Sequence, residues 1–419
     1  MHKFDIEGGA RLNGSVAASG SKNAALPILF ASILSDKKIT LTRVPKLKDI
    51  DTTLLLLQGI GASTSYENGK VQISIPKLAS CEAPYDLVRT MRASVLMLGP
   101  LLALAGKAKV SLPGGCAIGS RPVDLHLMGL EKMGAKLRLE QGYILGECPE
   151  GLSGAEIEFR MPSVGATENL MMAAVLAKGK TVIKNAAREP EISDLGEYLR
   201  KMGAKISGHG SSEIVIDGVN ALKACEHPVM FDRIEAGTLL LSGPITGGKV
   251  KVTGVDANSL TAFLDQLKLC GVKLSQGSDW LEAEMGAQAR GLDFSTEPFP
   301  GFPTDLQAQL MAFLAQLNSE SVISETIFEN RFMHVPELNR MGADIRVEGG
   351  RALIRGKSNC YQGAVVMATD LRASASLVLA ALSAKGESCV RRIYHLDRGY
   401  EGLETKLSSL GAKVIRKKE

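Results

Sequence analysis

The chain has 419 residues, too many for one hydrophobic core, and its 45% hydrophobic and 22% charged content is ordinary for a two-domain globular protein. Its net charge of +4 and its 5% aromatic content argue against a dedicated nucleic-acid surface and allow a local anion-binding cleft. Seven dispersed cysteines, a start without a signal peptide's apolar core, and the absence of a bilayer-length apolar run predict a cytoplasmic protein without membrane insertion.

Two predicted strands, at 3–6 and 14–18, precede six copies of one short signature. Each copy reads apolar, two variable residues, apolar, Gly, then Ala or Val, as in LQGIGA at 57–62. The signature glycines follow at spacings of 73, 69, 68, 71 and 69: Gly61, Gly134, Gly203, Gly271, Gly342 and Gly411. We therefore predict six repeats, each with an amphipathic helix that ends at a glycine and leads into a strand. Such strands are predicted at 136–139, 205–207, 344–347 and 413–415, and a hairpin turn at 68–69.

A second helix in each repeat is rich in Ala and Leu. These helices are predicted at 23–34, 93–105, 166–177, 236–241, 306–317 and 373–384. They are apolar nearly all round, so we expect them to be buried. Each repeat then has two helices and about four strands, which makes an α/β protein.

Six repeats divide naturally into three plus three. Residues 226–229 are the best candidate linker, and the first strands are expected to complete the last repeat. This predicts a first domain over 22–229 and a second over 1–21 plus 230–419.

Polar residues gather at the starts of all six predicted buried helices, and five of the six starts carry a basic or acidic residue. Helix N-termini bind anions through unpaired N–H groups and the helix dipole. If the two domains face each other, an anion site is expected from Lys22, Arg92, Arg121, Arg372 and Arg398. At any single position the alternative is an ordinary N-cap, as for Ser21, Ser163 and Thr304, or a surface salt bridge.

The stretch 111–125, SLPGGCAIGSRPVDL, is predicted to be a loop because of its Pro and Gly residues. A loop that carries a thiol at Cys116 and a cation at Arg121 suggests a catalytic lid, although an isolated cysteine more often packs inward. A phosphate loop ending at Thr181 is excluded because Ala174 stands where Gly is needed. The six histidines show no metal-ligand spacing, so no metal site is predicted.

Seven motifs along the chain together resemble the enolpyruvyl transferases that act on UDP-N-acetylglucosamine. They are SKNAA at 21–25, KLKD at 46–49, LPGGC at 112–116, RPVDLH at 121–126, PTD at 303–305, NRFMH at 330–334 and DLRAS at 370–374. The resemblance covers essentially the whole chain. It implies two inside-out α/β domains, each of three βαβαββ-type repeats, with a Cys116 lid that closes after the nucleotide sugar binds. It also implies that neither a metal nor an organic cofactor is needed.

The resemblance assigns roles to individual residues. Phosphoenolpyruvate is held by Lys22, Arg121 and Arg398, with Arg331 and Arg372 near its carboxylate, while Asn23 and Ile327 contact the nucleotide sugar. The uridine diphosphate portion is bound by Arg92, Arg121, Pro122, Val123, Asp124, Leu125, Ser163, Val164 and Gly165. One departure is Met161, where many relatives have lysine; the adjacent Arg160 is a candidate substitute.

The implied reaction adds the sugar 3-hydroxyl to C2 of phosphoenolpyruvate, protonates C3 and then eliminates phosphate. Asp305 is the candidate base and Cys116 the candidate acid, with a contribution from Lys22. The surrounding cations stabilise the departing phosphate. The resemblance further implies that the phosphonate epoxide fosfomycin alkylates Cys116.

Three other functions share some of these features. A shikimate enolpyruvyl transferase shares the repeats and the phosphoenolpyruvate chemistry, but it needs no nucleotide-sugar site. An RNA-end phosphate cyclase is disfavoured by the small charge and few aromatics, and a binding scaffold needs no charges at its buried helices. The predicted partners are small-molecule substrates, without nucleic acid or membrane, and the oligomeric state stays open.

Overall fold

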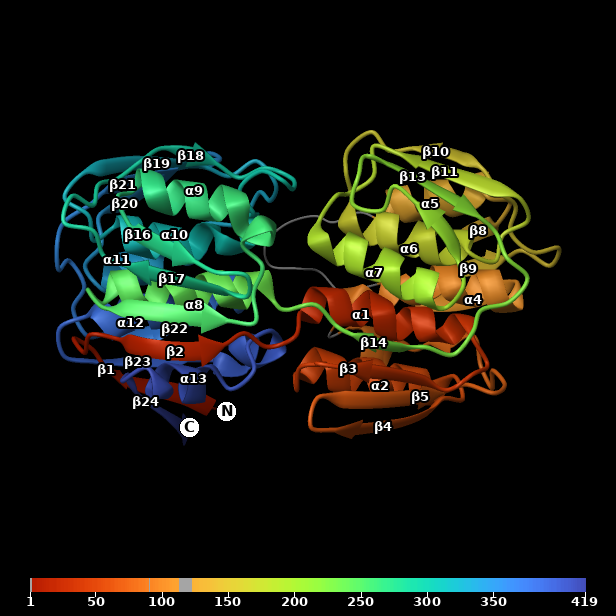
Figure 1. Ribbon diagram of the computed structural model, residues 1–419, viewed down its shortest axis with the longest axis horizontal. Helices are drawn as coiled ribbons and strands as arrows, with labels where there is room; N and C mark the ends of the chain where they lie inside the picture. Colours follow the sequence, from red (N-terminus) through yellow and green to blue (C-terminus); the bar gives the residue numbers. More distant parts are fainter. Residues whose placement is uncertain (1, 90, 113–122) are drawn as a thin grey trace. The chain divides into compact units, whose positions relative to one another are not determined.

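The computed structural model describes residues 2–89, 91–112 and 123–419. Contacts between Cα atoms divide the described residues into two compact units (Figure 1). We call residues 20–112 and 123–230 the N-terminal unit, and residues 2–19 and 231–419 the C-terminal unit. Each unit has its own cluster of buried hydrophobic side chains.

Within the described residues, the strands form six four-stranded sheets, one for each predicted repeat. In the third repeat, β10 (Glu156–Glu158), α6 (Val164–Ala174), β11 (Lys180–Lys184), α7 (Pro190–Lys201), β12 (Lys205–Ser207) and β13 (Glu213–Asp217) follow in βαβαββ order. The sheet order is β10-β11-β13-β12, with one parallel and two antiparallel pairs. This confirms the predicted α/β fold of repeated βαβαββ units.

The other two repeats of the N-terminal unit have the same plan. The first contains α1 (Lys22–Ala31), η1 (Ser32–Leu34), β3 (Ile39–Thr42), α2 (Lys48–Gly59), β4 (Ser63–Glu67), β5 (Lys70–Ser74) and β14 (Glu226–Pro228). The second contains β6 (Glu82–Ala83), α3 (Tyr85–Val88), η2 (Arg92–Met97), α4 (Leu98–Ala105), β7 (Lys107–Ser111), α5 (Asp124–Lys132), β8 (Lys136–Glu140) and β9 (Tyr143–Glu147).

The C-terminal unit repeats this plan three times. Its first repeat has β2 (Asn13–Ala17), α8 (Arg233–Ile245), β15 (Lys249–Thr253), η3 (Ala257–Leu260), α9 (Thr261–Leu269), β16 (Lys273–Gln276) and β17 (Trp280–Glu284). Its second has β18 (Phe294–Ser295), η4 (Thr304–Leu306), α10 (Gln307–Leu314), β19 (Glu320–Ser324), α11 (Val335–Arg340), β20 (Ile345–Glu348) and β21 (Arg351–Arg355). Its third has β22 (Val365–Met367), α12 (Leu371–Ser383), β23 (Glu387–Arg391), η5 (Ile393–Arg398), α13 (Leu403–Ser409), β24 (Lys413–Lys418) and β1 (His2–Glu7).

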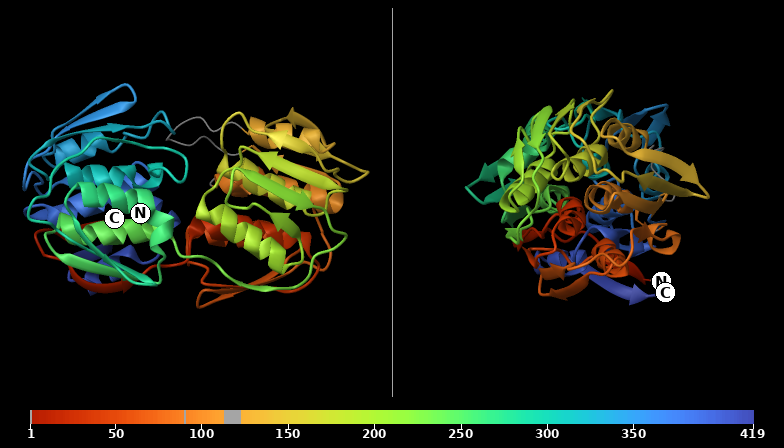
Figure 2. Two further views of the ribbon diagram at one scale, coloured as in Figure 1. Left: turned by 45° about the horizontal axis from the view of Figure 1, so that its top comes forward. Right: turned by 90° about the vertical axis from the view of Figure 1, so that its right-hand side faces the viewer.

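Three strands join sheets that are remote in sequence. β1 lies between β23 and β24, as predicted for the last repeat, and this pairing places the two chain ends side by side (Figure 2). β2 instead pairs with β15, so the expectation that it completes the last repeat is wrong. The predicted linker at 226–229 contains a strand, because Glu226–Pro228 pairs with β3 in a parallel ladder that occupies its backbone groups.

The Ala- and Leu-rich helices lie inside each unit, and the sheets lie outside (Figures 1 and 2). In the C-terminal unit, α8, α10 and α12 contact one another, and every residue of α8 is buried. The predicted end of α8 at 241 is too early. The helix continues past Gly243, where a Cβ would stand 2.8 Å from the Val250 nitrogen, because packing on β15 outweighs the weak helix propensity of this segment.

The amphipathic helices end as predicted. The six signature glycines all have φ between 83° and 106°, the left-handed region in which a residue with a Cβ is strained. Asn68 and Gly69 also have positive φ, at 46° and 77°, and connect β4 to β5 in the predicted hairpin.

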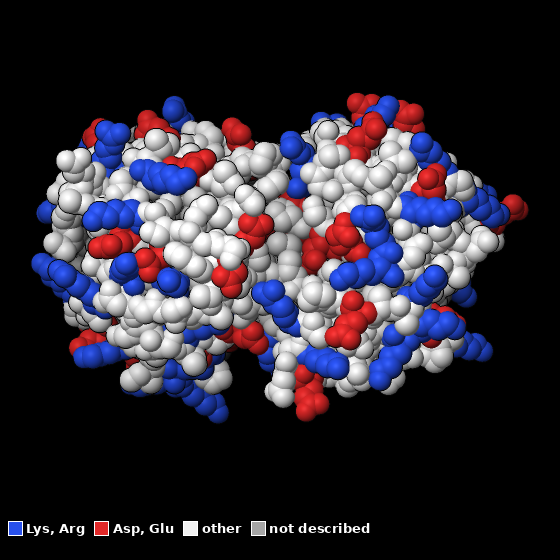
Figure 3. All heavy atoms as spheres, in the orientation of Figure 1, with Lys and Arg blue, Asp and Glu red and all other residues white. Residues whose placement is uncertain are grey.

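Basic and acidic side chains are interspersed on the face drawn in Figure 3, which fits the small net charge of +4. In the described ranges, no helix has the length and apolar character needed to cross a bilayer.

Candidate active site

Asp305 lies between two buried arginines in the C-terminal unit. Its Oδ1 accepts a hydrogen bond from Arg331 Nη2 at 2.7 Å, and its Oδ2 accepts one from Arg372 Nη2 at 2.8 Å. Both arginine side chains are 4% exposed, whereas that of Asp305 is 27% exposed. The three predicted site residues therefore meet in one cluster, which we call the Asp305 cluster, and its carboxylate reaches solvent.

The local structure places these three side chains. Asp305 stands in the 3-10 turn η4 at the entry to α10, and Arg372 follows Asp370, whose carboxylate caps α12 through the Arg372 and Ala373 N–H groups. Gln309, one turn into α10, donates to the Asp305 carbonyl at 3.0 Å and to the Tyr400 hydroxyl at 3.1 Å. A buried polar network thus holds the helix start that presents the carboxylate.

The Asp305 cluster has more positive than negative charge. Burial alone would lower the pKa of Arg372, but the nearby charge of Asp305 raises that pKa above its usual value, so the guanidinium stays ionised. Arg331 Nε and Arg372 Nη1 are buried without a hydrogen-bond partner. Two guanidinium groups around one carboxylate leave these donors for a further anion.

Thr304 is not an N-cap, which was the alternative interpretation of this residue, because Pro303 occupies the cap position. The Thr304 hydroxyl instead donates to Glu325 Oε2 at 2.9 Å. Glu325 Oε1 accepts from the backbone N–H groups of Ile327 and Phe328 at 2.9 and 3.1 Å. Glu325 therefore links the turn that carries Asp305 to the loop that carries Ile327.

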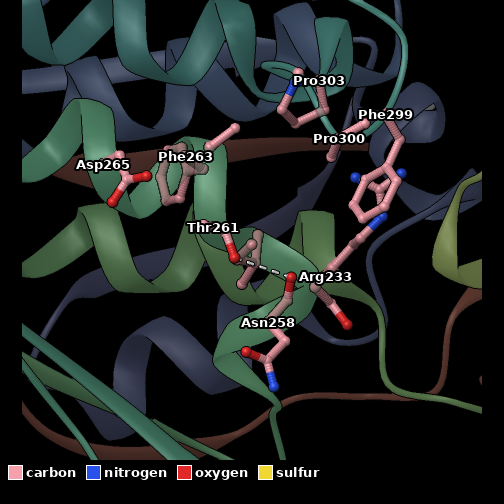
Figure 4. A pocket seen from close by; sticks show the side chains of 12 residues that line it. Arg233, Asn258, Thr261, Phe263, Asp265, Phe299, Pro300 and Pro303 are labelled. Carbon is pink, nitrogen blue, oxygen red and sulfur yellow. Dashed lines mark hydrogen bonds between the residues drawn. The ribbon is translucent and has the colours of Figure 1, made fainter.

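A pocket of about 380 Å³ lies near this turn (Figure 4). Pro303 and the cis-linked Phe299–Pro300 pair form one wall, and η3 with the start of α9 forms the other. The Arg233 guanidinium lies 5.9 Å from the centre of the Phe299 ring. None of the predicted site residues lines this pocket.

In the N-terminal unit, Lys22 begins α1 after Ser21, whose hydroxyl accepts from Ala24 N as the predicted N-cap. The Lys22 Nζ lies 3.4 Å from Asp49 Oδ2, and these side chains are 12% and 5% exposed. Asn23, the next residue of α1, is partly buried. Asp49 therefore orients the lysine predicted to hold phosphoenolpyruvate.

Three more helix starts in this unit carry predicted site residues. Arg92 begins η2, Val123 precedes α5, which starts with Asp124 and Leu125, and Ser163 caps α6 ahead of Val164 and Gly165. Arg160 Nη2 lies 2.7 Å from Asp124 Oδ2, while Met161 is 55% exposed. The arginine thus lies next to the α5 start, and Asp124 Oδ1 is buried without a hydrogen-bond partner.

The remaining predicted residues divide into two groups. Arg398 ends η5 in the C-terminal unit and is partly buried. Cys116, Arg121 and Pro122 lie outside the described residues. Among the residues that the structure does describe, no three His, Cys, Asp or Glu side chains are grouped to hold a metal ion.

Sequence reasoning gave no role to the residues that position this site. Asp49 lies within a motif that carried the resemblance, yet its contact with Lys22 depends on tertiary structure. Gln309 and Asn169 are buried amides within helices that are mostly apolar. A buried amide needs hydrogen-bond partners, so this pattern is the signal by which both could have been found.

Comparisons with known proteins cover nearly the whole chain. The family model described as EPSP synthase (3-phosphoshikimate 1-carboxyvinyltransferase) matches residues 6–407. A protein of Desulfovibrio desulfuricans named UDP-N-acetylglucosamine 1-carboxyvinyltransferase is 57% identical over the full length of both chains. A protein of Acinetobacter baylyi with the same name is 54% identical over 99% of this chain and all of its own.

Solved structures show the same architecture. The enolpyruvyl transferase NikO from Streptomyces tendae superposes with a TM-score of 0.90 at 25% identity, covering 99% of this chain and 98% of its own. An EPSP synthase from Acinetobacter baumannii has a TM-score of 0.78 at 18% identity over the full length of both chains, a likeness of fold alone.

Proposed function

The chain belongs to the EPSP synthase family, and from that premise we propose that it is a UDP-N-acetylglucosamine 1-carboxyvinyltransferase (EC 2.5.1.7). It transfers the enolpyruvyl group of phosphoenolpyruvate to the 3-hydroxyl of UDP-N-acetylglucosamine and releases phosphate. This reaction is the first committed step of peptidoglycan synthesis. The observation that carries the proposal is the 54–57% identity, over 99–100% of the chain, to relatives of that name.

The Asp305 cluster supports the chemistry of this reaction. A sugar hydroxyl needs a base, and the Asp305 carboxylate is the group in the cluster that can accept its proton. The carboxylate of phosphoenolpyruvate is a suitable partner for the unused donors on Arg331 and Arg372. A substrate carboxylate would compete with Asp305 for the two guanidinium groups, so the ion pairs that hold Asp305 can exchange partners.

The helix starts of the N-terminal unit support binding of the anionic substrates. Lys22, oriented by Asp49, is a cation for phosphoenolpyruvate, and Asn23 follows it as a contact for the sugar. Asp124 offers an unpartnered oxygen that can accept an N–H of the uracil base. Arg160 supplies the charge that relatives place at the position of Met161.

The proposal also assigns roles to four further residues and boundaries to the two domains. Cys116 is the proposed acid on a closing lid, Arg121 and Arg398 are proposed phosphate ligands, and Pro122 a proposed nucleotide contact. The domain boundaries at 22–229 and 1–21 plus 230–419, with the site between the domains, stay a prediction. A cytoplasmic location is also proposed, supported by the six unpaired cysteines among the described residues.

A phosphate-release assay tests the reaction. Purified protein with phosphoenolpyruvate and UDP-N-acetylglucosamine should release phosphate, and omission of either substrate should abolish release. Shikimate 3-phosphate is the matched alternative acceptor, because the family name refers to it. Turnover with shikimate 3-phosphate and none with the nucleotide sugar would overturn the proposal.

A further inference from the structure

A buried amide connects three helices in the N-terminal unit. Asn169, on α6, is fully buried, and its Oδ1 accepts from the Gly99 N–H in α4 at 2.7 Å. Its Nδ2 lies 3.3 Å from the Val95 carbonyl oxygen in η2 and 3.0 Å from His126 Nδ1 in α5. We call these groups the Asn169 network. It ties together the helices that begin at or beside Arg92, Asp124 and Gly165.

Two backbone groups determine the orientation of this amide. The Gly99 N–H can only donate, so the Asn169 atom facing it must be the oxygen. The Val95 carbonyl can only accept, so the atom facing it must be the nitrogen. That nitrogen donates to His126 Nδ1, which must therefore be unprotonated. The proton of a neutral His126 ring consequently sits on Nε2.

The rest of the ring faces the start of α6. His126 is 7% exposed, and a Cβ added to Gly165 would stand 3.2 Å from its Cε1 and 3.4 Å from its Nε2. In the described structure no protein group accepts a hydrogen bond from Nε2, or from the N–H groups of Val164 and Gly165. Three donors thus lie close together at one helix start.

The charges around this ring come from neighbouring elements. Burial, the largest cause, and the Arg92 charge on η2 together lower the pKa of His126 to about 4, while Asp124 on α5 acts in the opposite direction. A proton on Nδ1 would also meet the N–H of Asn169. The ring is therefore neutral throughout the physiological range.

We propose that His126 donates its Nε2–H to a phosphate oxygen of the nucleotide diphosphate bound at the start of α6, and that Asn169 is the positioning residue for this donor. This inference rests on the proposed function, which supplies the ligand. A neutral donor gives a hydrogen bond whose strength does not change with pH between about 5.5 and 8. Gly165 is needed because a side chain there would push the ring away from the ligand.

Nuclear magnetic resonance on the full chain tests the tautomer without reference to any activity. Long-range ¹H–¹⁵N spectra of the ¹⁵N-labelled protein, with His126→Phe to assign the signal among six histidines, should show His126 protonated at Nε2 and bare at Nδ1. UDP-N-acetylglucosamine should then shift the Nε2 resonance. The Nδ1–H tautomer in the free protein, or an unchanged Nε2 resonance at saturation, would overturn the inference.

Calorimetry with UDP-N-acetylglucosamine tests the contact itself. His126→Phe keeps the ring volume and removes the donor, so the affinity should fall about 10-fold, the usual effect of losing one hydrogen bond to a charged group. His209→Phe is the matched control, because that ring also packs against a helix glycine, Gly196. Equal affinity of the unmodified and His126→Phe proteins would overturn this inference alone. Failure of the unmodified protein to bind would overturn the proposed function and, with it, the ligand.

Asn169→Asp separates a positioning role from a merely structural one. A carboxylate can still accept from Gly99 N–H, but it attracts a proton to His126 Nδ1. At neutral pH the lone pair of Nε2 then faces the ligand, and at lower pH an imidazolium donates to it. Affinity for the nucleotide sugar should therefore depend on pH in this variant and not in the unmodified protein. A folded variant with an unchanged pH profile would contradict the positioning role.

Discussion

The Asp305 cluster and the Asn169 network both stabilise buried polar side chains, the first with charged groups and the second with neutral ones. Both hold buried polar side chains close to helix starts that carry predicted site residues, one in each unit. The Asp305 cluster does so with full charges, two guanidinium groups around a carboxylate, and leaves two donors unused. The Asn169 network uses neutral groups, and two of its bonds go to the backbone.

This difference suits the two regions to different roles, proton transfer in the Asp305 cluster and fixed hydrogen bonding in the Asn169 network. Ion pairs can exchange partners when a substrate carboxylate arrives, so the charged cluster is suited to a step in which a proton moves. Bonds to the backbone cannot be exchanged without moving a helix, so the neutral network is suited to holding a fixed donor. The following predictions test this contrast, from the largest expected effect to the smallest.

Replacing Asp305 by Asn removes the negative charge of the cluster and keeps its shape. An amide cannot accept the proton of the sugar hydroxyl, so turnover should fall roughly 10²-fold or more. Phosphate release and a thermal melt on the same sample measure activity and folding. Asp265→Asn is the control, since Asp265 is an exposed aspartate of the same unit. Near-normal turnover of Asp305→Asn would remove this residue from the mechanism.

Acid should destabilise both regions through a buried neutral histidine. Burial lowers the pKa of His126, and likewise that of His334 beside Arg331, to about 4, below the value of about 6.5 in the unfolded chain. Between these values the unfolded chain binds more protons, so stability is present above about pH 6.5 and is lost towards pH 4. Each ring should account for roughly 3 kcal/mol of that loss.

Urea unfolding at several pH values measures this effect. Between pH 6.5 and 4, the unfolding free energy of His126→Phe should fall less steeply than that of the unmodified protein. The difference between the two slopes should correspond to at most one proton taken up on unfolding. An identical slope would show that the ring titrates alike in the folded and unfolded chains.

Thr304→Val breaks the link between the Asp305 turn and the Ile327 loop. The Thr304 hydroxyl bonds Glu325, which in turn holds the Ile327 N–H. Loss of one hydrogen bond of about 1 kcal/mol should raise KM for UDP-N-acetylglucosamine about 5-fold with little change in kcat. Thr304→Ser keeps the hydroxyl and should restore KM. Equal KM values in all three proteins would contradict this link.

Arg160→Ala should have the smallest effect. The Arg160 and Asp124 side chains are 65% and 41% exposed, and exposed ion pairs contribute little. We expect the affinity for the nucleotide sugar to fall about 2-fold at low salt, with no difference at high salt. A loss of more than 10-fold in a titration would mean that Arg160 binds the diphosphate as strongly as a buried cation.

The sequence by itself determined the repeat architecture and the predicted members of the Asp305 cluster. Six glycines at near-constant spacing reflect a local requirement, a left-handed residue after each amphipathic helix, so they are visible without tertiary structure. The helices were likewise predictable from their apolar composition. Arg372 was predicted from the charges at the helix starts, and Asp305 and Arg331 by resemblance; the structure brings both arginines into contact with Asp305.

Only the tertiary structure decided which strands complete which sheets and how the buried amides bond. β2 and β14 pair with strands far away in sequence, because an unpaired strand edge is satisfied by whichever neighbour the fold supplies. Asn169 forms hydrogen bonds with Gly99, 70 residues away in the sequence, and with His126, 43 residues away. No local sequence pattern predicts such long-range contacts. The tautomer of His126 follows from the contact with Asn169, because the Asn169 atom that faces Nδ1 in space decides whether Nδ1 accepts or donates.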